Sequence, residues 1–253
     1  MKVFITGGTS GIGLALAQRY RSQGDEVAVF ALPGPSPVDG LEIRRYTGDV
    51  RDRESLKCAV ADFAEGRLDL MIAAAGINHG YALRQWPDFD LEKRIIEVNL
   101  LGVVHAFEAA TAAMAPHRAG HLVAIASASG LVGVPGSAGY TASKAAVITL
   151  CEALAIDLSR LGLVVSCFAP GFVETPLTED NPDPMPFKMS AAAAALRIHE
   201  AIAAGAEFVV FPWQVRGIFT VLRLLPRPIY RWLFRRAYAR RMARLALAGS
   251  LAQ

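Results

Sequence analysis

Short apolar runs alternate along the chain with longer segments in which apolar residues repeat every three or four positions. Apolar runs bounded by turn residues predict β-strands, and the longer periodic segments predict amphipathic helices. The predicted strands are residues 3–6, 27–31, 70–74, 121–127, 164–168 and 208–211, with a weaker one at 43–46. The predicted helices are residues 11–23, 52–64, 90–114, 138–161 and 190–204.

This alternation is typical of the α/β fold class. The strands are apolar on both faces, which indicates a mostly parallel sheet covered by helices on both sides. We therefore expect a doubly wound, Rossmann-type sheet in a single domain, residues 1–212, followed by a helical C-terminal tail, residues 213–253. Ligands of such a sheet bind beyond the carboxyl ends of the strands.

One long segment interrupts the alternation within the domain. Residues 174–189 read ETPLTEDNPDPMPFKM, which is rich in Pro and acidic residues and too long for a simple connection. Long loops of this kind in compact domains are usually lids or binding loops. We expect this segment to fold over a substrate.

Charge is distributed unevenly along the 253 residues. The formal charge is +3, yet from Arg216 onward there are nine Arg and no Asp, Glu or Lys. Before Arg216, 17 Lys and Arg stand against 23 Asp and Glu, a formal charge of −6. The body is therefore mildly acidic and the tail strongly basic.

The cysteines and the N-terminus indicate a cytoplasmic protein. Cys58, Cys151 and Cys167 lack the CxxC spacing of a zinc site or a disulfide framework, so we expect no metal and a reducing compartment. The N-terminal residues MKVFITGG predict a buried strand and not a secretory signal. No run of eighteen apolar residues occurs.

The basic tail has several possible roles. Its arginines at 223, 227, 231 and 235 recur every four positions among Leu, Ile, Trp, Phe and Tyr. Such a helix could lie peripherally on a membrane with Trp232 and Phe234 below its Arg groups, or it could cover its own body or a second subunit. We expect no nucleic-acid partner, because the body contains no recognition module.

A glycine-rich turn, TGGTSGIG, joins the first predicted strand to the first predicted helix. Glycines there let the backbone approach a pyrophosphate, and a helix N-terminus offers unpaired N–H groups and a positive partial charge. The turn therefore predicts a dinucleotide site, and a tight turn without a ligand is the alternative.

Tyr140 and Lys144, in the stretch YTASK, stand four residues apart at the start of a predicted helix. One helical turn separates them, so they share a face. Most such pairs are solvated neighbours. A free phenol has a pKa of about 10, and an adjacent ammonium favours the phenolate. In a suitable site this pair could act as a general acid/base.

Together these motifs resemble the short-chain dehydrogenase/reductase family over roughly residues 2–212. The spacing of Gly7, Gly11 and Gly13 is similar, and the later motifs follow in the family's order. These are Asp49–Val50, AAAG at residues 73–76 where the family commonly has NNAG, Asn99 in EVNLLG, Ser127 with Tyr140 and Lys144 at the catalytic spacing, and Pro170–Gly171 with Thr175.

The resemblance implies an NAD(P)(H)-dependent oxidoreductase with a catalytic set of Asn99, Ser127, Tyr140 and Lys144. Ser127 would stabilise charge on the substrate oxygen, Tyr140 would exchange a proton with it, Lys144 would hold the nicotinamide ribose, and Asn99 would hold a relay water. The implied cofactor contacts are Gly7, Thr9, Ser10, Gly11, Ile12, Gly13, Asp49, Val50, Ala75, Gly76, Tyr140, Lys144, Pro170, Gly171, Val173 and Thr175. Because AAAG lacks the asparagines, part of the usual backbone bracing must come from elsewhere or be absent.

The end of the second predicted strand bears on the choice of cofactor. Ala31 stands where an NAD enzyme of this family would have Asp, and Leu32 and Ser10 stand where NADP enzymes often have Arg or Lys. Without a carboxylate to repel a phosphate, NADP(H) is slightly favoured over NAD(H), with Arg44 or Arg45 as candidates to meet the 2′-phosphate.

The substrate is expected to be a small apolar ketone, aldehyde or alcohol, including lipid-like ones. An apolar pocket would form if residues 174–189 fold over it, and the alternative is that the same side chains pack only against the body. A non-catalytic redox sensor and a membrane-surface scaffold are the other functions considered. We expect a homodimer more than a tetramer, because the tail follows the last strand, near which short family members often pack. The predicted pocket residues are 131–135, Phe172, Leu177, Met185, Phe187 and Met189.

Overall fold

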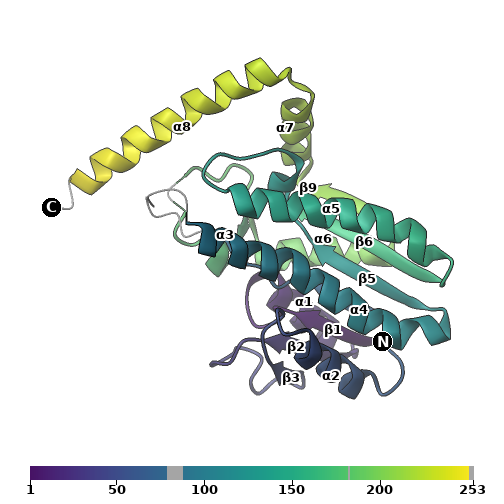
Figure 1. The fold of residues 1–253 in the computed structure, drawn as a ribbon. Coiled ribbons are helices and arrows are strands. Elements are labelled where there is room, and N and C mark those ends of the chain that lie inside the picture. Colours follow the sequence, from purple (N-terminus) through teal and green to yellow (C-terminus); the bar gives the residue numbers. More distant parts are fainter. Residues whose placement is uncertain (79–87, 182, 251–253) are drawn as a thin grey trace.

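Seven parallel strands form one sheet at the centre of the protein (Figure 1). The computed structural model describes residues 1–78, 88–181 and 183–250, with side chains as far as Ala243. The strand order is β3-β2-β1-β4-β5-β6-β9, and a short pair, β7 with β8, forms a separate ribbon. The strands are β1 (Lys2–Thr6), β2 (Glu26–Ala31), β3 (Arg44–Thr47), β4 (Leu70–Ala73), β5 (Gly120–Ile125), β6 (Leu163–Pro170), β7 (Val173–Glu174), β8 (Met189–Ser190) and β9 (Phe208–Phe211).

Helices cover both faces of the sheet. On one face lie α1 (Gly11–Ser22) and α6 (Ala191–Ala203), and on the other lie α2 (Arg53–Ala64), α4 (Gly102–Met114) and α5 (Ala138–Ser159). Strand order reverses between β1 and β4, which creates the crevice where doubly wound sheets bind ligands. Short single turns occupy Ala115–His117, Ala128–Leu131 and Pro176–Thr178.

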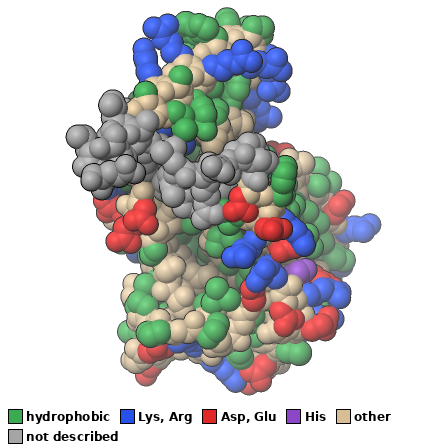
Figure 2. All heavy atoms as spheres, turned by 60° about the vertical axis from the view of Figure 1, so that its left-hand side comes forward, with side chains coloured by type: hydrophobic (Ala, Val, Ile, Leu, Met, Phe, Trp, Pro, Cys, Tyr) green, Lys and Arg blue, Asp and Glu red, His purple; other side chains and the backbone are tan. Residues whose placement is uncertain are grey.

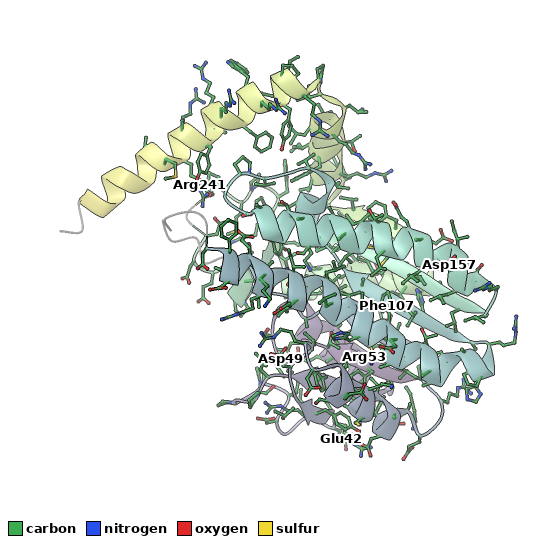
Figure 3. All side chains as sticks on the ribbon, in the orientation of Figure 1. Glu42, Asp49, Arg53, Phe107, Asp157 and Arg241 are labelled. Carbon is green, nitrogen blue, oxygen red and sulfur yellow. The ribbon has the colours of Figure 1, made fainter. Side chains whose placement is uncertain are left out.

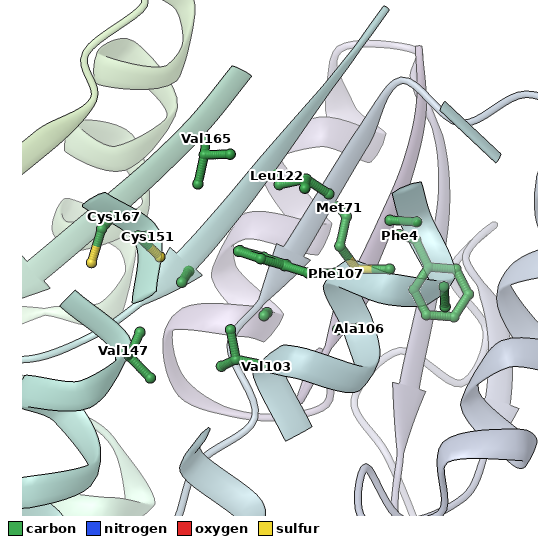
Figure 4. Close-up of a cluster of buried hydrophobic side chains, with 14 of the residues drawn as sticks. Phe4, Met71, Val103, Ala106, Phe107, Leu122, Val147, Cys151, Val165 and Cys167 are labelled. Carbon is green, nitrogen blue, oxygen red and sulfur yellow. The ribbon is translucent and has the colours of Figure 1, made fainter. Parts of the chain in front are cut away.

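The core consists of two apolar layers, one on each side of the sheet. Met71 and Leu122 point from neighbouring strands toward Phe107 of α4 (Figure 4), and Phe4 packs beside Phe63 of α2 in the same layer. Because side chains alternate along a strand, Val3 and Ile5 point to the opposite face and pack with α1 and α6. Each fully buried side chain of this size contributes roughly 1.5–3 kcal/mol to folding.

This architecture confirms the predicted fold class, including the helical tail, but one predicted helix differs in detail. Residues 90–114 were expected to form one regular helix; instead α3 (Phe89–Ile96) passes through a π-helical turn, Glu97–Leu101, before α4. A π-turn inserts one residue into the helical register, and such insertions occur often at functional sites. The inserted turn contains Asn99.

Among the described residues, the stretch Phe89–His117 is the one helix long and apolar enough to cross a membrane. Its α4 part packs Ala106, Phe107 and Ala110 against the sheet. Its apolar character is therefore explained by the core.

The tail forms two helices, α7 (Trp213–Leu224) and α8 (Arg227–Ser250). The break between them falls at Leu225, whose ψ of 137° is extended. Pro226 explains this break, because proline disfavours a helical conformation in the residue before it. In Figure 1, α8 extends from the end of α7 across the loop that precedes α5.

Candidate active site

The glycine turn brings the backbone close to the ends of three strands. Gly7 has a φ of +69°, and a Cβ at this position would lie 2.7 Å from the backbone of Ala75. At Gly13 a Cβ would lie 2.3 Å from the carbonyl oxygen of Gly7. Only glycine fits this packing, which aims the first turn of α1, with its unpaired N–H groups, at the crevice.

A groove of about 620 Å³ runs over the carboxyl ends of the strands. Its volume lies within the range of small-molecule and cofactor sites. Every residue predicted to contact the cofactor lines it, from Gly7, Thr9, Ser10, Gly11, Ile12 and Gly13 at one end, through Asp49, Val50, Ala75 and Gly76, to Tyr140, Lys144, Pro170, Gly171, Val173 and Thr175 at the other.

Two arginines on one side of the groove form ion pairs with carboxylates. Arg51 donates from Nε and a terminal nitrogen to Asp49 Oδ2, at 3.0 and 2.7 Å. This hydrogen bonding lowers the pKa of the Asp49 carboxyl and keeps it ionised. Arg45 also lines the groove, where its terminal nitrogen lies 3.0 Å from Asp39 Oδ1.

The two arginines considered for a 2′-phosphate have different surroundings. Arg44 donates to Asp62 on α2 at 2.8 Å and is not among the residues lining the groove. Consecutive residues of a strand point to opposite faces, which explains why only Arg45 faces the groove. Leu32, Pro33 and Gly34 complete the rim beyond β2, with no carboxylate among them.

Ser127, Tyr140 and Lys144 meet where this groove joins a second cavity. Ser127 follows β5, and Tyr140 and Lys144 lie in the first two turns of α5. The Lys144 ammonium lies 5.8 Å from the centre of the Tyr140 ring. Ser127 and Tyr140 line both cavities, so they form the boundary between them.

Ser129, which lies just beyond Ser127, orients the Ser127 hydroxyl. Its backbone N–H and its hydroxyl both donate to Ser127 Oγ, at 3.2 and 2.9 Å. Ser127 accepts in both bonds, so its own O–H is available to donate toward a substrate oxygen. Both serines line the second cavity.

Lys144 is almost fully buried, and its Nζ donates to the carbonyl oxygen of Ile125 at 2.8 Å. Burial lowers the pKa of this ammonium to about 8, because the charged form loses its hydration. A Cβ at Gly76 would lie 3.3 Å from Asn99 Oδ1, a tight contact, and 3.5 Å from Nζ, an ordinary van der Waals distance. An ammonium has three donors, so two remain for a ligand.

Asn99 braces the loop that carries Gly76. Its Oδ1 accepts from the N–H of Ile77 at 2.8 Å, and its Nδ2 donates to the Ile77 carbonyl at 2.9 Å and to Ser143 Oγ at 3.1 Å. Ser143 in turn donates to the Tyr140 carbonyl at 2.8 Å. With the hydroxyl of Thr6, which accepts from Ala75 N at 3.4 Å, this network supplies bracing that the asparagines of NNAG would otherwise give.

A buried carboxylate supports the start of α5. Glu92 of α3 is buried, and its Oε2 accepts from the Gly139 N–H at 2.6 Å. A carboxylate at a helix N-terminus satisfies an unpaired donor and opposes the positive end of the helix dipole. Glu92 thereby fixes the turn from which Tyr140 projects.

The second cavity, of about 360 Å³, lies beyond Ser127 and Tyr140 and is mostly apolar. Of the predicted pocket residues, Val134, Pro135, Phe172 and Leu177 line it. The tail supplies much of the remaining wall, which no sequence motif predicts. The tail residues in the wall are Val215, Phe219, Phe234, Ala237, Tyr238 and Arg241.

Other predicted pocket residues lie elsewhere, which corrects that part of the expectation. Met189 begins β8 and packs into the core with α6, and Phe187 is largely exposed. Met185 is also absent from the wall, and Leu131 lines a neighbouring cavity beneath Tyr230. The ribbon between β7 and β8 turns this half of the loop away from the cavity.

Two polar contacts hold α8 over the cavity. Arg241 extends from α8 toward the loops beneath it (Figure 3), and its Nε lies 2.7 Å from Asp183 Oδ2. Near the other end of the helix, the Tyr230 hydroxyl donates to the Gly133 carbonyl. The contacts reach two different loops, so α8 closes the cavity from above.

Residues 1–185 match the family model described as short chain dehydrogenase. An uncharacterized oxidoreductase of Myxococcus xanthus is 32% identical over 238 residues, which cover 89% of this chain and 93% of that protein. The 3-oxoacyl-acyl-carrier-protein reductase MabA of Mycobacterium tuberculosis is 32% identical over 180 residues, 70% of each chain.

A solved structure is similar as well. A variant of the actinorhodin polyketide ketoreductase with NADPH superposes with a TM-score of 0.73 at 28% identity. The superposition covers 83% of this chain and 94% of the ketoreductase.

Proposed function

The chain belongs to the short-chain dehydrogenase family and is an NAD(P)-dependent oxidoreductase, and from that premise we propose that it interconverts an apolar carbonyl compound and its alcohol. The observation that carries the proposal is the position of Ser127 and Tyr140 on the boundary between the dinucleotide groove and an apolar cavity. A carbonyl group at this boundary would face a cofactor on one side and an apolar wall on the other.

In the reducing direction, the bound cofactor would supply a hydride to the carbonyl carbon. Ser127 would donate a hydrogen bond to the carbonyl oxygen and stabilise the charge that develops there. Tyr140 would transfer its phenolic proton to the same oxygen and complete the alcohol. Lys144, with two donors available, would bind the ribose and favour the phenolate that Tyr140 becomes. The oxidation would reverse each transfer.

The cradle fits a nicotinamide dinucleotide. Gly7 and Gly13 leave no room for side chains where the first turn of α1 faces the groove, as a pyrophosphate site requires. We propose NADP(H) as the preferred form, because Arg45 lines the groove and the rim residues beyond β2, Leu32, Pro33 and Gly34, include no carboxylate. We propose that Asn99 supports the catalytic set, and more specifically that it holds a water in a proton relay.

The substrate is proposed to be a ketone on an apolar chain. Phe172, Leu177, Phe219 and Phe234 give the cavity wall its apolar character. The relative from Mycobacterium tuberculosis is named a 3-oxoacyl reductase, which supports a ketone carried on an acyl chain. Residues 174–189 are proposed as the substrate loop, through Leu177, Thr178, Asn181 and Asp183.

We propose that the reaction takes place in the cytoplasm. We also propose that the domain, residues 1–212, and the tail, residues 213–253, act as one catalytic unit. A homodimer remains the proposed assembly. Contact with a membrane depends on the outer surface of the tail, which is a separate feature.

Replacement of Tyr140 by Phe tests the proposed chemistry. The variant should lose about 10²-fold to 10⁴-fold in kcat while it still binds the cofactor, because only the proton transfer is removed. The measurement is cofactor absorbance with apolar ketones of increasing chain length, in parallel with NADPH and NADH.

Tyr46→Phe is the matched control, since its phenol binds Asp62 on α2, away from the groove. It should keep full activity. Unchanged turnover in Tyr140→Phe would refute the role of the phenol. A protein that binds NADPH but turns over none of the ketones would favour the redox-sensor alternative.

A further inference from the structure

The tail exposes apolar side chains that the rest of the protein does not cover. On α7, Trp213, Val221 and Leu224 are 75%, 60% and 78% exposed. Their spacing of eight and three residues places them on one face of the helix. The opposite face, with Val215 and Phe219, packs against the body.

On α8 the two faces also differ. Tyr230, Phe234, Tyr238 and Arg241 face the cavity and its loops. Residues 229, 232, 233, 236 and 240 are spaced by three, four, seven and eleven from the first, so they share the outward face. Ile229, Trp232 and Leu233 on this face are exposed, and the Arg236 guanidinium lies 5.7 Å from the centre of the Trp232 ring.

Unpaired positive charge accompanies these apolar groups. Seven arginines of the tail are exposed, and among residues 1–78, 88–181 and 183–243 none of the seven has an ion-pair partner. They are Arg216, Arg223, Arg227, Arg231, Arg235, Arg236 and Arg240. Figure 2 shows Arg and apolar side chains gathered together on this end of the molecule.

Arginines of the body behave differently. Arg53 pairs with Glu108, Arg44 with Asp62 and Arg51 with Asp49. Carboxylates of the body therefore neutralise these three arginines. Charge in the tail is therefore both uncompensated and placed beside exposed Trp and Leu.

We propose that the outward faces of α7 and α8, here called the tail surface, bind an anionic lipid bilayer. Exposed Trp and aliphatic side chains beside cations are the pattern of helices that lie in a membrane interface. Each Arg near an anionic surface contributes about 1 kcal/mol, and the mildly acidic body would turn away from the same surface. A bilayer accepts both kinds of group at once, whereas RNA offers no apolar partner for Ile229 and Leu233.

Membrane docking through the tail surface would also narrow the substrate class, and this part of the inference rests on the proposed function. The inward face of α8 walls the cavity next to Tyr140, so docking of the outward face would hold the cavity within one helix diameter, roughly 10 Å, of the lipid. An apolar ketone that partitions into the bilayer would then reach the site over a short path. The substrate class inferred is a lipid-soluble carbonyl compound.

Vesicle flotation of the full-length protein tests the proposal directly. Vesicles of phosphatidylcholine with phosphatidylglycerol should carry the protein at low salt, and phosphatidylcholine alone should carry at least about tenfold less. Binding should weaken between about 0.1 M and 1 M salt, where the Debye length falls from ~10 to ~3 Å. Tryptophan emission should shift to the blue, since Trp213 and Trp232 both lie on the tail surface.

Matched variants distinguish binding through the tail surface from a general effect of net charge. Arg236→Gln with Arg240→Gln should lower partitioning roughly 30-fold, at about 1 kcal/mol per Arg. Arg160→Gln with Arg197→Gln removes the same charge from the residue that follows α5 and from α6, and should change partitioning less than about twofold. Trp232→Ala should lower partitioning about tenfold, and Ile156→Ala, an exposed residue of α5, should leave it unchanged.

Several outcomes would overturn the proposal. Equal binding to neutral and anionic vesicles, or equal effects of the two Arg pairs, would remove the tail surface as the binding site. If single-stranded RNA displaced the protein from vesicles, the tail surface would be assigned to RNA. If the protein dimerised without lipid in a salt-sensitive way, and the same variants abolished this, the surface would be assigned to a second copy. Tyr140→Phe should float with vesicles like the parent protein. Failure of the catalytic proposal can therefore be distinguished from failure of the membrane proposal.

Discussion

At the scale of single residues, two adjacent arginines of β3 show how strand geometry separates roles. Arg45 lines the groove and Arg44 binds Asp62. We expect Arg45→Ala to weaken NADPH binding by about tenfold or more, because a charge-assisted hydrogen bond contributes about 1.5–3 kcal/mol. NADH binding should hardly change. Titration of cofactor fluorescence with both cofactors measures this difference.

Arg44→Ala is the control, and its affinity for both cofactors should match that of the parent protein. An equal loss of NADPH and NADH affinity in Arg45→Ala would mean that the side chain supports the groove and does not select the phosphate.

A second residue predicts how stability depends on pH. His121 on β5 lies 2.7 Å from Ser166 Oγ, and Ser166 donates to the Ala206 carbonyl, so the imidazole is the donor between them. Burial lowers the pKa of His121 to about 4, against about 6.5 when unfolded. The unfolded state therefore binds the additional proton between these values, and stability is complete above pH 6.5 and decreases as the pH falls toward 4.

Replacement of His121 by Gln should keep a donor and remove this titration. Urea unfolding at pH 7 and pH 5 should show a smaller loss of unfolding free energy in the variant than in the parent protein. Parallel losses in both proteins would assign the acid sensitivity to other groups.

At the scale of elements, most of the sheet and its helices could be predicted, because their periodicity is local. Val3 to Ile5 and Leu70 to Ile72 are apolar on both faces, as buried parallel strands require. The π-turn at Asn99 could not be predicted, since it depends on bonds to Ile77 and Ser143, far away in the chain. Likewise, spacing motifs pointed to Tyr140 and Lys144, but nothing local pointed to the contact of Glu92 with Gly139.

Glu92 gives a prediction about α5. Glu92→Gln removes a charge from the helix N-terminus and should cost about 1 kcal/mol. For a chain of this size, that corresponds to a decrease in Tm of roughly 2–4 °C. kcat should fall as well, because Tyr140 follows Gly139 directly, and a thermal melt combined with steady-state kinetics measures both.

Glu152→Gln, on an exposed part of α5, should change neither quantity. A decrease in Tm with unchanged kcat would show that Glu92 stabilises the helix without influencing Tyr140.

At the scale of the whole molecule, the tail completes a cavity that the motif-bearing part of the chain leaves open. Charge and amphipathic spacing predicted a basic helix, but which face meets the body depends on Tyr230 with Gly133 and on Arg241 with Asp183. Partners so far apart in sequence leave no local signal. For the same reason the pocket residues of the loop were only partly predicted.

Two aromatic neighbours on α8 should have separable effects. Phe234→Ala removes part of the cavity wall and should raise KM for a long-chain ketone about tenfold, at roughly 1.5 kcal/mol of lost apolar contact. Trp232→Ala, on the outward face, should leave KM in lipid-free solution unchanged. Steady-state kinetics with short and long ketones measures the difference, and equal effects of the two changes would argue against the wall.

The slender attachment of α8 has a consequence for how the protein opens. Helices cover both faces of the sheet, whereas the described residues of α8 are mostly exposed. The polar contacts described above between α8 and the body are the Tyr230 hydrogen bond and the Arg241–Asp183 ion pair. Amide protons in this helix should therefore exchange by a local opening of small free energy, long before those of β1, β4 and β5. Hydrogen exchange would therefore detect α8 detaching while the sheet and its covering helices stay folded.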